Sequence, residues 1–568
     1  MTRFQNLTKR FSLRNIAPSD RPVLVLGAVF FTITLLVTLN RYFSFFASYD
    51  QGIFNQVFWN GLHGRFFQSS LSSVLSSSVV HDGQPPAVYY HRLGQHFTPA
   101  LLLWLPFYAL HPSADTLVVI QVSLITLGGL VLYALARHYL QPNSALLITA
   151  GYYGANAVIG PTFSNFHDLC QIPLFVFSLL LALEKRIWWL VWLMAFLLLM
   201  VREDAGVSLF GVGFYLLVSR RFPRLGVAFC ALGFGAVAFT SSVLMPLFSE
   251  DISRRFAIER FGQYASSDEA SMLEILLAIL TKPGALLGTI SSNPHIKLFY
   301  VFIQVLPLAF VPLRSPWAWT IAGFPFLQLL VQRGQSPLSL HIRYAITLVP
   351  GLFYGSILWW AQRSDRFQKK FQRFWKGCIV LSVLIAFCYS PYDAFYFIFP
   401  TSYQPWVYVS LPRQWEHVSQ LNQFIKQIPP DASVSATTYV IPHLASRREL
   451  LRAPFLEFRN DQKQVEPVDY ILLDLWQLER YSVVFRAERS NLQTLVPLVE
   501  QLQSQNKYGI TGLSDRVILL QRNQPTEPKL RQDWAQLRQE YEQLLRSYSQ
   551  KKSAGTQANP DFSKKPEM

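Results

Sequence analysis

The sequence predicts an α-helical polytopic membrane protein that carries a small α/β domain outside the membrane. Of its 568 residues, 51% are hydrophobic and only 15% are charged, whereas soluble domains average about 25% charged residues. Apolar runs of roughly 15 to 24 residues, long enough to cross a bilayer, recur along the first 400 residues. Beyond residue 400 short strand-like and helix-like segments alternate instead, which indicates a separate α/β domain.

Charge and cysteine content narrow the class of partner. A net charge of +16 would suggest nucleic-acid binding in a soluble protein. In a membrane protein this excess is typical of basic cytoplasmic loops, so we expect the lipid bilayer as a partner and no nucleic acid. The four cysteines lie in or beside apolar runs and show no CxxC spacing, so the sequence indicates neither a disulfide framework nor a zinc site.

About eleven transmembrane helices are expected after a basic N-terminal tail, residues 1–21. The apolar run after this tail has no small-residue cleavage site before it and is interpreted as a retained first span. The expected spans are 22–43, 115–137, 143–163, 169–184, 187–201, 205–219, 225–248, 297–313, 316–332, 343–361 and 376–398. A further apolar stretch, 96–110, is short and contains two prolines, so we expect it to lie in the interface.

The distribution of basic residues sets the expected orientation. With eleven spans, the strongly basic loop "QRSDRFQKKFQRFWK" (362–376) and the N-terminal tail both face the cytoplasm, as the positive-inside rule requires. The C-terminal domain is then extracytoplasmic. We expect the protein in the cell (inner) membrane, with its N-terminus cytoplasmic.

This topology defines the expected domains. A transmembrane domain, 22–400, carries two large outer loops, about 44–114 and 249–296. An extracytoplasmic α/β domain follows at 411–521, in which "VDYILLDLW" is expected to form a central strand. The remaining residues, 524–568, are polar. We expect a Gln/Glu/Arg-rich helix there and then disorder, and take the segment as a whole as a disordered tail.

Five polar clusters lie at or near the outer ends of the expected spans. Ionisable groups this close to hydrocarbon are costly and usually line a cavity or pair with one another. The candidate residues are Asp50; Arg92 and His96, with His91 beside them; His167 and Asp168; Arg202, Glu203 and Asp204; and His341, Arg343 and Tyr344.

Each cluster also has a simpler interpretation. A single His or Arg at a helix end is more often an interfacial anchor than a catalytic group. Asp50 is well placed to cap the helix that begins "QGIFNQVFWNGL", and "RED" (202–204) is equally typical of a pair that caps a helix–helix turn. The functional hypothesis depends on all five clusters facing one side of the membrane.

The plan of the chain resembles the GT-C membrane glycosyltransferases: a short cytoplasmic tail, one span, then a large outer loop that opens with Asp. The chain is still more similar to a family of predicted multi-spanning microbial membrane proteins related to these enzymes. The likeness extends to about residue 521 and is carried by "YDQGIFNQVFW", "HFTP", "FHD", "REDAG", "HIRY", "SATTYVIPHLASR" and "VDYILLDL". GT-C enzymes commonly have a second acidic group in later outer loops, a role that only "RED" or "HD" could fill here.

The resemblance implies a GT-C-like fold and a membrane glycosyltransferase that moves a sugar from a polyprenyl-phosphate-linked donor to an acceptor at the outer face. Asp50 would be the general base that accepts the acceptor's proton. Arg343 and Arg92 would hold the donor phosphate, with Arg202 as a weaker candidate. The other cluster residues would bind substrate.

The metal requirement is left open by the sequence. A divalent cation is possible, held by carboxylates among the candidate residues together with an imidazole. The side chains available for it are Asp50, His167, Asp168, Glu203 and Asp204.

Two alternatives stay open. A transporter or lipid flippase would use the outer cluster as a substrate vestibule, but would need matching polar sites on the inner half of the spans. "GYYGANAVIGPTF" is the nearest candidate for such an unwound segment. In the third interpretation the protein is a membrane scaffold whose outer α/β domain binds a partner.

Overall fold

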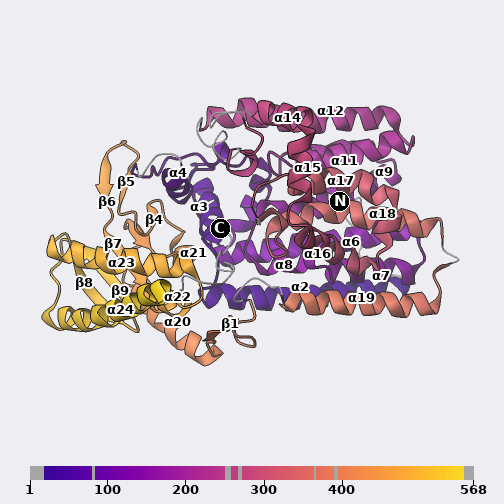
Figure 1. The fold of residues 1–568 in the computed structure, drawn as a ribbon. Coiled ribbons are helices and arrows are strands. Elements are labelled where there is room, and N and C mark those ends of the chain that lie inside the picture. The colour runs from indigo at the N-terminus through magenta and orange to yellow at the C-terminus, as the bar shows by residue number, and fades with distance from the viewer. Residues whose placement is uncertain are drawn as a thin grey trace, which may run out of the picture.

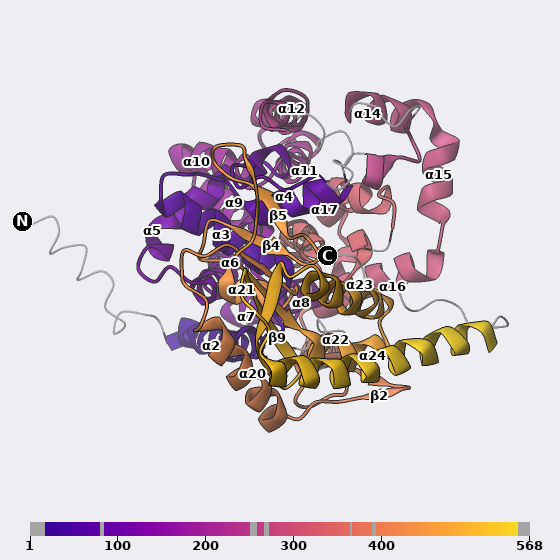
Figure 2. The same ribbon diagram turned by 90° about the vertical axis from the view of Figure 1, so that its left-hand side faces the viewer.

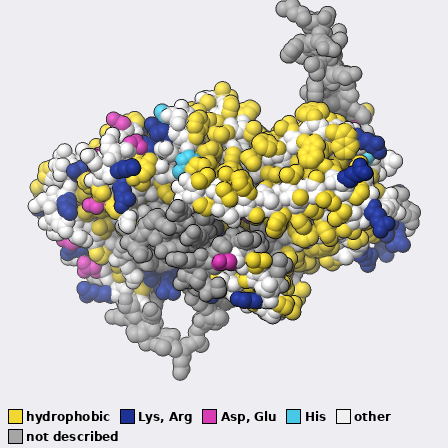
Figure 3. Space-filling model, turned by 90° about the horizontal axis from the view of Figure 1, so that it is seen from above, with side chains coloured by type: hydrophobic (Ala, Val, Ile, Leu, Met, Phe, Trp, Pro, Cys, Tyr) yellow, Lys and Arg dark blue, Asp and Glu magenta, His cyan; other side chains and the backbone are white. Residues whose placement is uncertain are grey.

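The computed structural model describes residues 18–79, 84–249, 258–265, 272–334, 336–363, 366–388 and 394–554. A bundle of helices forms one part of the molecule, and a smaller part with a β-sheet lies beyond one end of the bundle (Figure 1). Hydrophobic side chains cover much of the bundle surface in Figure 3. Lys and Arg gather on the C-terminal part and at the far end of the bundle, as expected of a protein that crosses a membrane.

The bundle is built from apolar helices. Five of its helical segments in the described residues are long and apolar enough to cross a membrane, and several shorter apolar helices pack with them. The helices are α2 (Arg21–Phe43), α6 (Ala114–Tyr139), α7 (Pro142–Tyr153), α8 (Asn156–Phe163), α9 (Ile172–Glu184), α10 (Trp188–Leu199), α11 (Gly206–Val218), α12 (Pro223–Phe239), α16 (Pro294–Val305), α17 (Pro316–Leu330), α18 (Val349–Ala361) and α19 (Lys369–Cys388).

The expected spans correspond to these helices, but several are interrupted. The span expected at 143–163 is two helices, α7 and α8, separated at Gly154. The last expected span, 376–398, is corrected: α19 begins at Lys369, inside the basic segment, and ends at Cys388. The helix can begin within the basic segment because the aliphatic part of a Lys or Arg side chain lies along the helix while its charged end reaches water. The count of eleven spans and the orientation of the termini stay predictions.

The two outer loops contain short helices. The first loop holds α3 (Tyr49–Leu62), α4 (Ser70–Val79) and α5 (Leu105–Tyr108), the last preceded by a 3-10 turn. The helical stretch Pro99–Tyr108 is too short to cross a bilayer. The second loop holds α14 (Met272–Thr281) and α15 (Pro283–Ser291), whose Leu277 and Leu287 are exposed. Figure 2 shows α14 and α15 along one side of the bundle.

A five-stranded mixed sheet forms the centre of the C-terminal part, in the order β4-β3-β7-β9-β8. The strand β3 pairs in parallel with β4 and β7, and β9 pairs antiparallel with β7 and β8. The central strand expected in "VDYILLDLW" is present as β7. The bounds of the strands are β3 (Val434–Ala436), β4 (Leu450–Arg452), β7 (Tyr470–Asp474), β8 (Tyr508–Ser514) and β9 (Val517–Arg522), with helices α20 (Leu411–Ile425), α21 (Ile441–Leu444), α22 (Leu475–Ser482) and α23 (Arg486–Ser504).

Two small hairpins accompany this sheet. One, β1 (Ser402–Tyr403) with β2 (Trp406–Val407), lies between the bundle and α20. The other, β5 (Glu457–Arg459) with β6 (Val465–Pro467), reaches back to the first outer loop, where the Val88 backbone N–H donates to the Arg459 carbonyl at 3.0 Å. The second hairpin therefore ties the sheet region to the loop that contains α3.

The C-terminal part rests directly on α3. A Cβ added to Gly52 would lie 2.6 Å from Ile441 Cγ2 of α21, so only glycine permits this contact. Gln56 Nε2 donates to the Arg447 carbonyl at 3.1 Å, and Ser70 Oγ donates to the Leu450 carbonyl at 2.7 Å. The same hydrophobic core runs from the bundle through α3 into the sheet region. The helix α3, which carries Asp50 in its first turn, is thus held from both sides.

The polar C-terminal segment differs in part from expectation. Residues Pro528–Ala554 form one helix, α24, as expected of the Gln/Glu/Arg-rich stretch, so this part of 524–568 is not a disordered tail. The disorder expected after the helix falls on residues 555–568, which lie outside the described range. The helix is held in place by an apolar stripe: Trp534, Leu537 and Tyr541 are spaced to share one helix face and are buried against the sheet region.

Candidate functional site

Asp50 and Arg343 form an ion pair at the end of the bundle on which the C-terminal part rests. Asp50 lies in the first turn of α3, and Arg343 begins the 3-10 turn that leads into α18. Their Oδ2 and Nη1 atoms are 2.5 Å apart, and the side chains are 14% and 19% exposed. The structure therefore brings the expected general base and the expected phosphate ligand together, but as partners of each other.

The outer-loop residues Arg92 and His96 lie beside this pair. His96 Nδ1 is 2.9 Å from Glu203 Oε1, and the Phe97 backbone N–H donates to the other Glu203 oxygen at 3.0 Å. Arg92 is 4% exposed, and its guanidinium lies over the Phe54 ring of α3 at 4.7 Å. The first outer loop thus connects α3 to the "RED" turn between α10 and α11.

Arg202 and Asp204 form a two-pronged pair within the same turn, with N–O distances of 2.7 and 2.5 Å. Gln328 of α17 donates to Asp204 at 3.0 Å. The Arg202 guanidinium also lies 5.4 Å from the centre of the Tyr344 ring. The turn-cap interpretation of Arg202 holds in part, because its carboxylate partner is Asp204 rather than Glu203.

Sequence reasoning missed two residues of this region. Arg260, in the second outer loop, donates to the Tyr344 hydroxyl at 3.4 Å, and Gln328 holds Asp204. Arg260 follows an apolar and basic stretch with no helix end to mark it, and Gln328 lies inside an apolar span. A polar amide within such a span was the available signal.

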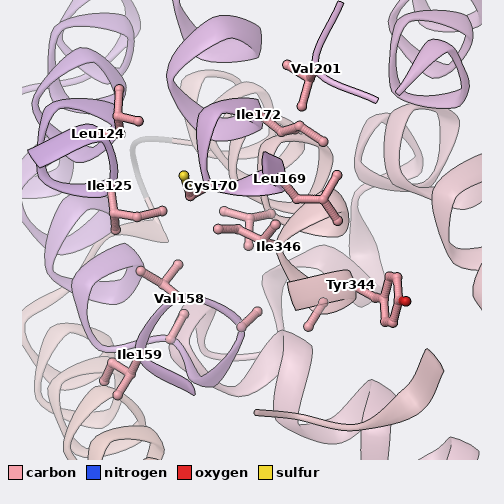
Figure 4. Packing of buried hydrophobic residues seen from close by; sticks show 14 of the residues in the cluster. Leu124, Ile125, Val158, Ile159, Leu169, Cys170, Ile172, Val201, Tyr344 and Ile346 are labelled. Carbon is pink, nitrogen blue, oxygen red and sulfur yellow. The ribbon is translucent and has the colours of Figure 1, made fainter. Parts of the chain in front are cut away.

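His167 and Asp168 are buried where α8 gives way to α9, each 2% exposed. The neighbouring residues Leu169 and Cys170 point into the hydrophobic core beside Ile346 (Figure 4). The Asp168 carboxylate accepts a hydrogen bond from the Leu169 N–H at 3.0 Å. Packing of the flanking residues thus fixes the position of this polar pair.

The charges of these residues act on one another. Burial would raise the pKa of Asp50, but Arg343, Arg92 and His96 together hold that pKa below its usual value, so the carboxylate is ionised at neutral pH. Burial lowers the pKa of His167 to about 3 despite the adjacent Asp168, so its imidazole is neutral. The arrangement contains an ionised carboxylate and a neutral imidazole among arginines.

Three of these buried side chains have hydrogen-bonding atoms without a partner. They are Arg92 Nε, Arg202 Nη1 and both ring nitrogens of His167. A buried donor without a partner costs about 1–3 kcal/mol, and more when the group is charged. Ordered water or a polar ligand would satisfy these atoms.

His341 does not join this group. Its ring nitrogens lie 3.2 and 3.3 Å from the Ser339 hydroxyl, and the charge that acts on it comes from Arg41. His91 also points elsewhere and stacks on Phe248 at 4.5 Å. Among the residues that the structure describes, no three His, Cys, Asp or Glu side chains lie close enough to hold a metal ion. The five candidate metal ligands are therefore not gathered into one metal site.

A cavity of about 540 Å³ is lined by residues of α15, α16 and the end of α17, none of which belongs to the group around Asp50. Its wall includes Lys297, Arg333 and Gln263, contributed by α16 and by the segments around the end of α17 and before α14. The Arg333 N–H donates to the Arg260 carbonyl at 2.7 Å, so the cavity is linked to the Tyr344 side of the site. Leu287 and Leu298 on its flanking helices are 65% and 71% exposed, so an exposed apolar surface borders the cavity.

Comparison with solved structures returns neighbours that are GT-C glycosyltransferases. ArnT from Cupriavidus metallidurans bound to undecaprenyl phosphate is 12% identical with a TM-score of 0.46, over 87% of this chain and 97% of that one. The apo structure of the same ArnT is 11% identical with a TM-score of 0.42, again over 87% of this chain and 97% of that one. The Archaeoglobus fulgidus oligosaccharyltransferase, in complex with Zn and sulfate, is 13% identical with a TM-score of 0.34, over 84% of this chain and 71% of that one.

Among curated proteins, none matches the chain. A family model does. It covers residues 41–519, from the outer end of α2 to the last strand of the sheet, and so includes every element that contributes to the site. The chain belongs to the family of predicted membrane proteins designated DUF2079.

Proposed function

We propose that the protein is a membrane glycosyltransferase that moves a sugar from a polyprenyl-phosphate-linked donor to an acceptor hydroxyl at the outer face of the membrane. The observation that carries the proposal is the buried site around Asp50, in which an ionised carboxylate lies among arginines with unsatisfied donors. The motif order of the sequence supports the same reaction class.

The donor phosphate is assigned to Arg92 and Arg202. Arg343 pairs with Asp50 at 2.5 Å and Arg202 pairs with Asp204 through Nε and Nη2. The difference is that Arg202 Nη1, like Arg92 Nε, is a buried donor that has no partner among the described residues. A guanidinium binds phosphate through charge-assisted hydrogen bonds, which are about twice as strong as neutral ones. This assignment replaces Arg343 by Arg202 in the expected phosphate site and keeps Arg92.

Asp50 is assigned as the general base. An ionised carboxylate can accept the acceptor's proton as the hydroxyl attacks the sugar, while Arg343 fixes its position. Because the pKa of Asp50 is lowered, the carboxylate is a weak base, and it needs close alignment with the hydroxyl. His167, neutral and with both nitrogens unpartnered, can hydrogen-bond the acceptor or the sugar.

The cavity beside α15 and α16 suits a lipid-linked donor. Lys297 and Arg333 supply positive charge at its wall, and exposed leucines on the adjoining helices face lipid. A polyprenyl chain lying along these helices would bring its phosphate toward Arg260 and Tyr344, which are 3.4 Å apart. The membrane location that the proposal needs follows from the apolar helices of the bundle.

The inner end of the bundle argues against the transporter alternative. Glu184, at the end of α9, is bonded by Arg221 at 2.7 Å and by the Tyr354 hydroxyl at 2.6 Å, and its side chain is 3% exposed. This inner polar group is satisfied by the protein itself, unlike the outer group. A vestibule that alternates between two faces would need a substrate site near the middle of the bundle, whereas Glu184 is engaged by its own neighbours at the end of α9.

The test is binding of polyprenyl phosphate to the purified protein. Arg92→Gln and Arg202→Gln should each weaken binding about tenfold, because each removes a charge-assisted hydrogen bond. Arg65→Gln is the control: it removes one charge from the same outer loop, where Arg65 lies 5.5 Å from the Trp59 ring. Equal weakening in all three variants, or in none, would overturn the phosphate assignment.

A further inference from the structure

A second cavity, of about 560 Å³, lies in the C-terminal part and shares no lining residue with the site around Asp50. Elements far apart in the sequence meet there: β2, α20, α22, the β8–β9 turn and α24, which lie together along the lower edge of Figure 2. Its charged lining residues are Arg413, Arg480, Arg516, Glu479 and Asp515.

Arg480 is the lining cation whose charge is not matched. Arg413 pairs with Asp515 at 2.5 Å, and Arg516 pairs with Glu479. The guanidinium of Arg480 instead lies 5.2 Å from the Trp476 ring and donates to the Tyr408 carbonyl at a long 3.5 Å. No carboxylate of the described residues lies within ion-pair distance of it.

A charged histidine, His417, is held in place beside Trp476. His417 stacks on the Trp476 ring at 4.1 Å and is held between Asp474 at 3.2 Å and Asp515 at 2.8 Å. These two carboxylates are thereby engaged with His417 and Arg413, and Glu479 is engaged with Arg516. Each of these carboxylates is therefore already paired with another side chain, and Arg480 is the lining cation that can bind an anion.

The cavity lies at the membrane boundary. Its lining residue Val407 packs with Phe46, three residues beyond the end of the apolar helix α2, and with Tyr396. Gln414 of α20 donates to the Ser44 carbonyl at 2.8 Å, which fixes α20 to the same helix end. In Figure 1 the β1–β2 hairpin lies beside this end of α2.

The hairpin has the composition of an interfacial anchor. Tyr403 and Trp406 are 67% and 64% exposed, and Ile398 and Phe399 just before them are also exposed. Aromatic side chains are enriched where a membrane protein meets the headgroup layer. Trp406 lines the cavity, so one wall of the cavity reaches the depth at which lipid headgroups lie.

We propose that this cavity binds the anionic headgroup of an outer-leaflet phospholipid, with the phosphate on Arg480 and the glycerol backbone against Trp406. A guanidinium beside an indole suits a phosphate at the interface because it supplies directed donors and is weakly hydrated. The proposal does not depend on the glycosyltransferase reaction.

The experiment uses the full-length protein in a non-ionic detergent. Binding of soluble dihexanoyl-phosphatidylglycerol is measured by calorimetry, beside dihexanoyl-phosphatidylcholine and glycerol 3-phosphate. We expect phosphatidylglycerol to bind best and Arg480→Gln to weaken it about tenfold, the value of one charge-assisted hydrogen bond. Arg486→Gln, which removes an exposed charge from the same domain, should bind as wild type does.

Trp406→Ala is a second, independent test, because this exposed side chain can be removed without unfolding the domain. It should weaken phosphatidylglycerol and leave any binding of glycerol 3-phosphate unchanged. The proposal is overturned if phosphatidylcholine binds equally well, if glycerol 3-phosphate binds as tightly as the lipid, or if Arg480→Gln and Arg486→Gln behave alike.

Discussion

Replacing Asp50 by Asn separates a catalytic carboxylate from a structural one. The substitution keeps the shape and one acceptor oxygen, but it removes the negative charge 2.5 Å from Arg343. Removing one partner of a fully buried ion pair costs about 3–5 kcal/mol. Both side chains here are partly exposed, and the charge of Asp168 also acts on Arg343. We therefore expect a loss of about 1–3 kcal/mol, which leaves a domain of ordinary stability folded.

The expected loss of activity is larger. Removal of a general base typically slows a reaction by about a hundredfold to ten-thousandfold, equivalent to roughly 3–5 kcal/mol in the barrier. The assay follows release of polyprenyl phosphate from a labelled polyprenyl-phosphate sugar in proteoliposomes, with an envelope extract as the source of acceptor. Asp115→Asn is the matched control, because Asp115 also lies in the first turn of a helix and bonds the Thr116 N–H at 3.0 Å.

A double variant distinguishes a base from a counter-ion. If Asp50 serves only to neutralise Arg343, then Asp50→Asn combined with Arg343→Gln should recover stability and activity together. As a general base, Asp50 leaves the double variant stable but inactive. The reasoning is refuted if Asp50→Asn retains more than about a tenth of wild-type activity, or if the double variant regains activity.

Three further outcomes are expected. The pKa of His417 is raised to about 9, against burial, by Asp474 and Asp515, so its stabilisation is complete below about pH 6.5 and is lost as the pH rises through 9; thermal unfolding should show this fall, and His417→Gln should remove it. Accessibility tags should place Gln368 in the cytoplasm and Lys463 outside, and the reverse pattern would invert every site assignment. Glu184→Gln should lower the unfolding temperature without changing polyprenyl-phosphate binding, because its bonds join helices at the opposite end of the bundle; a loss of binding would revive the transporter alternative.

Much of the outer site could be predicted because charge at the end of an apolar run is costly and therefore informative. The pairing of these charges could not be predicted, because Asp50 and Arg343 are 293 residues apart and no sequence spacing links them. The unsatisfied nitrogens of His167 depend on how α8 and α9 pack, which composition does not encode. The helix of α24 was expected from its Gln/Glu/Arg-rich composition, but its packing was not: Trp534 and Tyr541 fall on one helix face and are buried against the sheet region.

The contact between the C-terminal part and α3 has a consequence for the synthesis and folding of the protein. Gly52 and Gln56 find their partners at Ile441 and Arg447, almost four hundred residues later in the chain. During synthesis α3 must therefore remain without these partners until the C-terminal part of the chain has been made. A chain cut short after α19 would insert its spans yet leave the helix that carries Asp50 without one of its two supports. Asp50 therefore gains its full support only once the C-terminal part has been made and has folded onto α3.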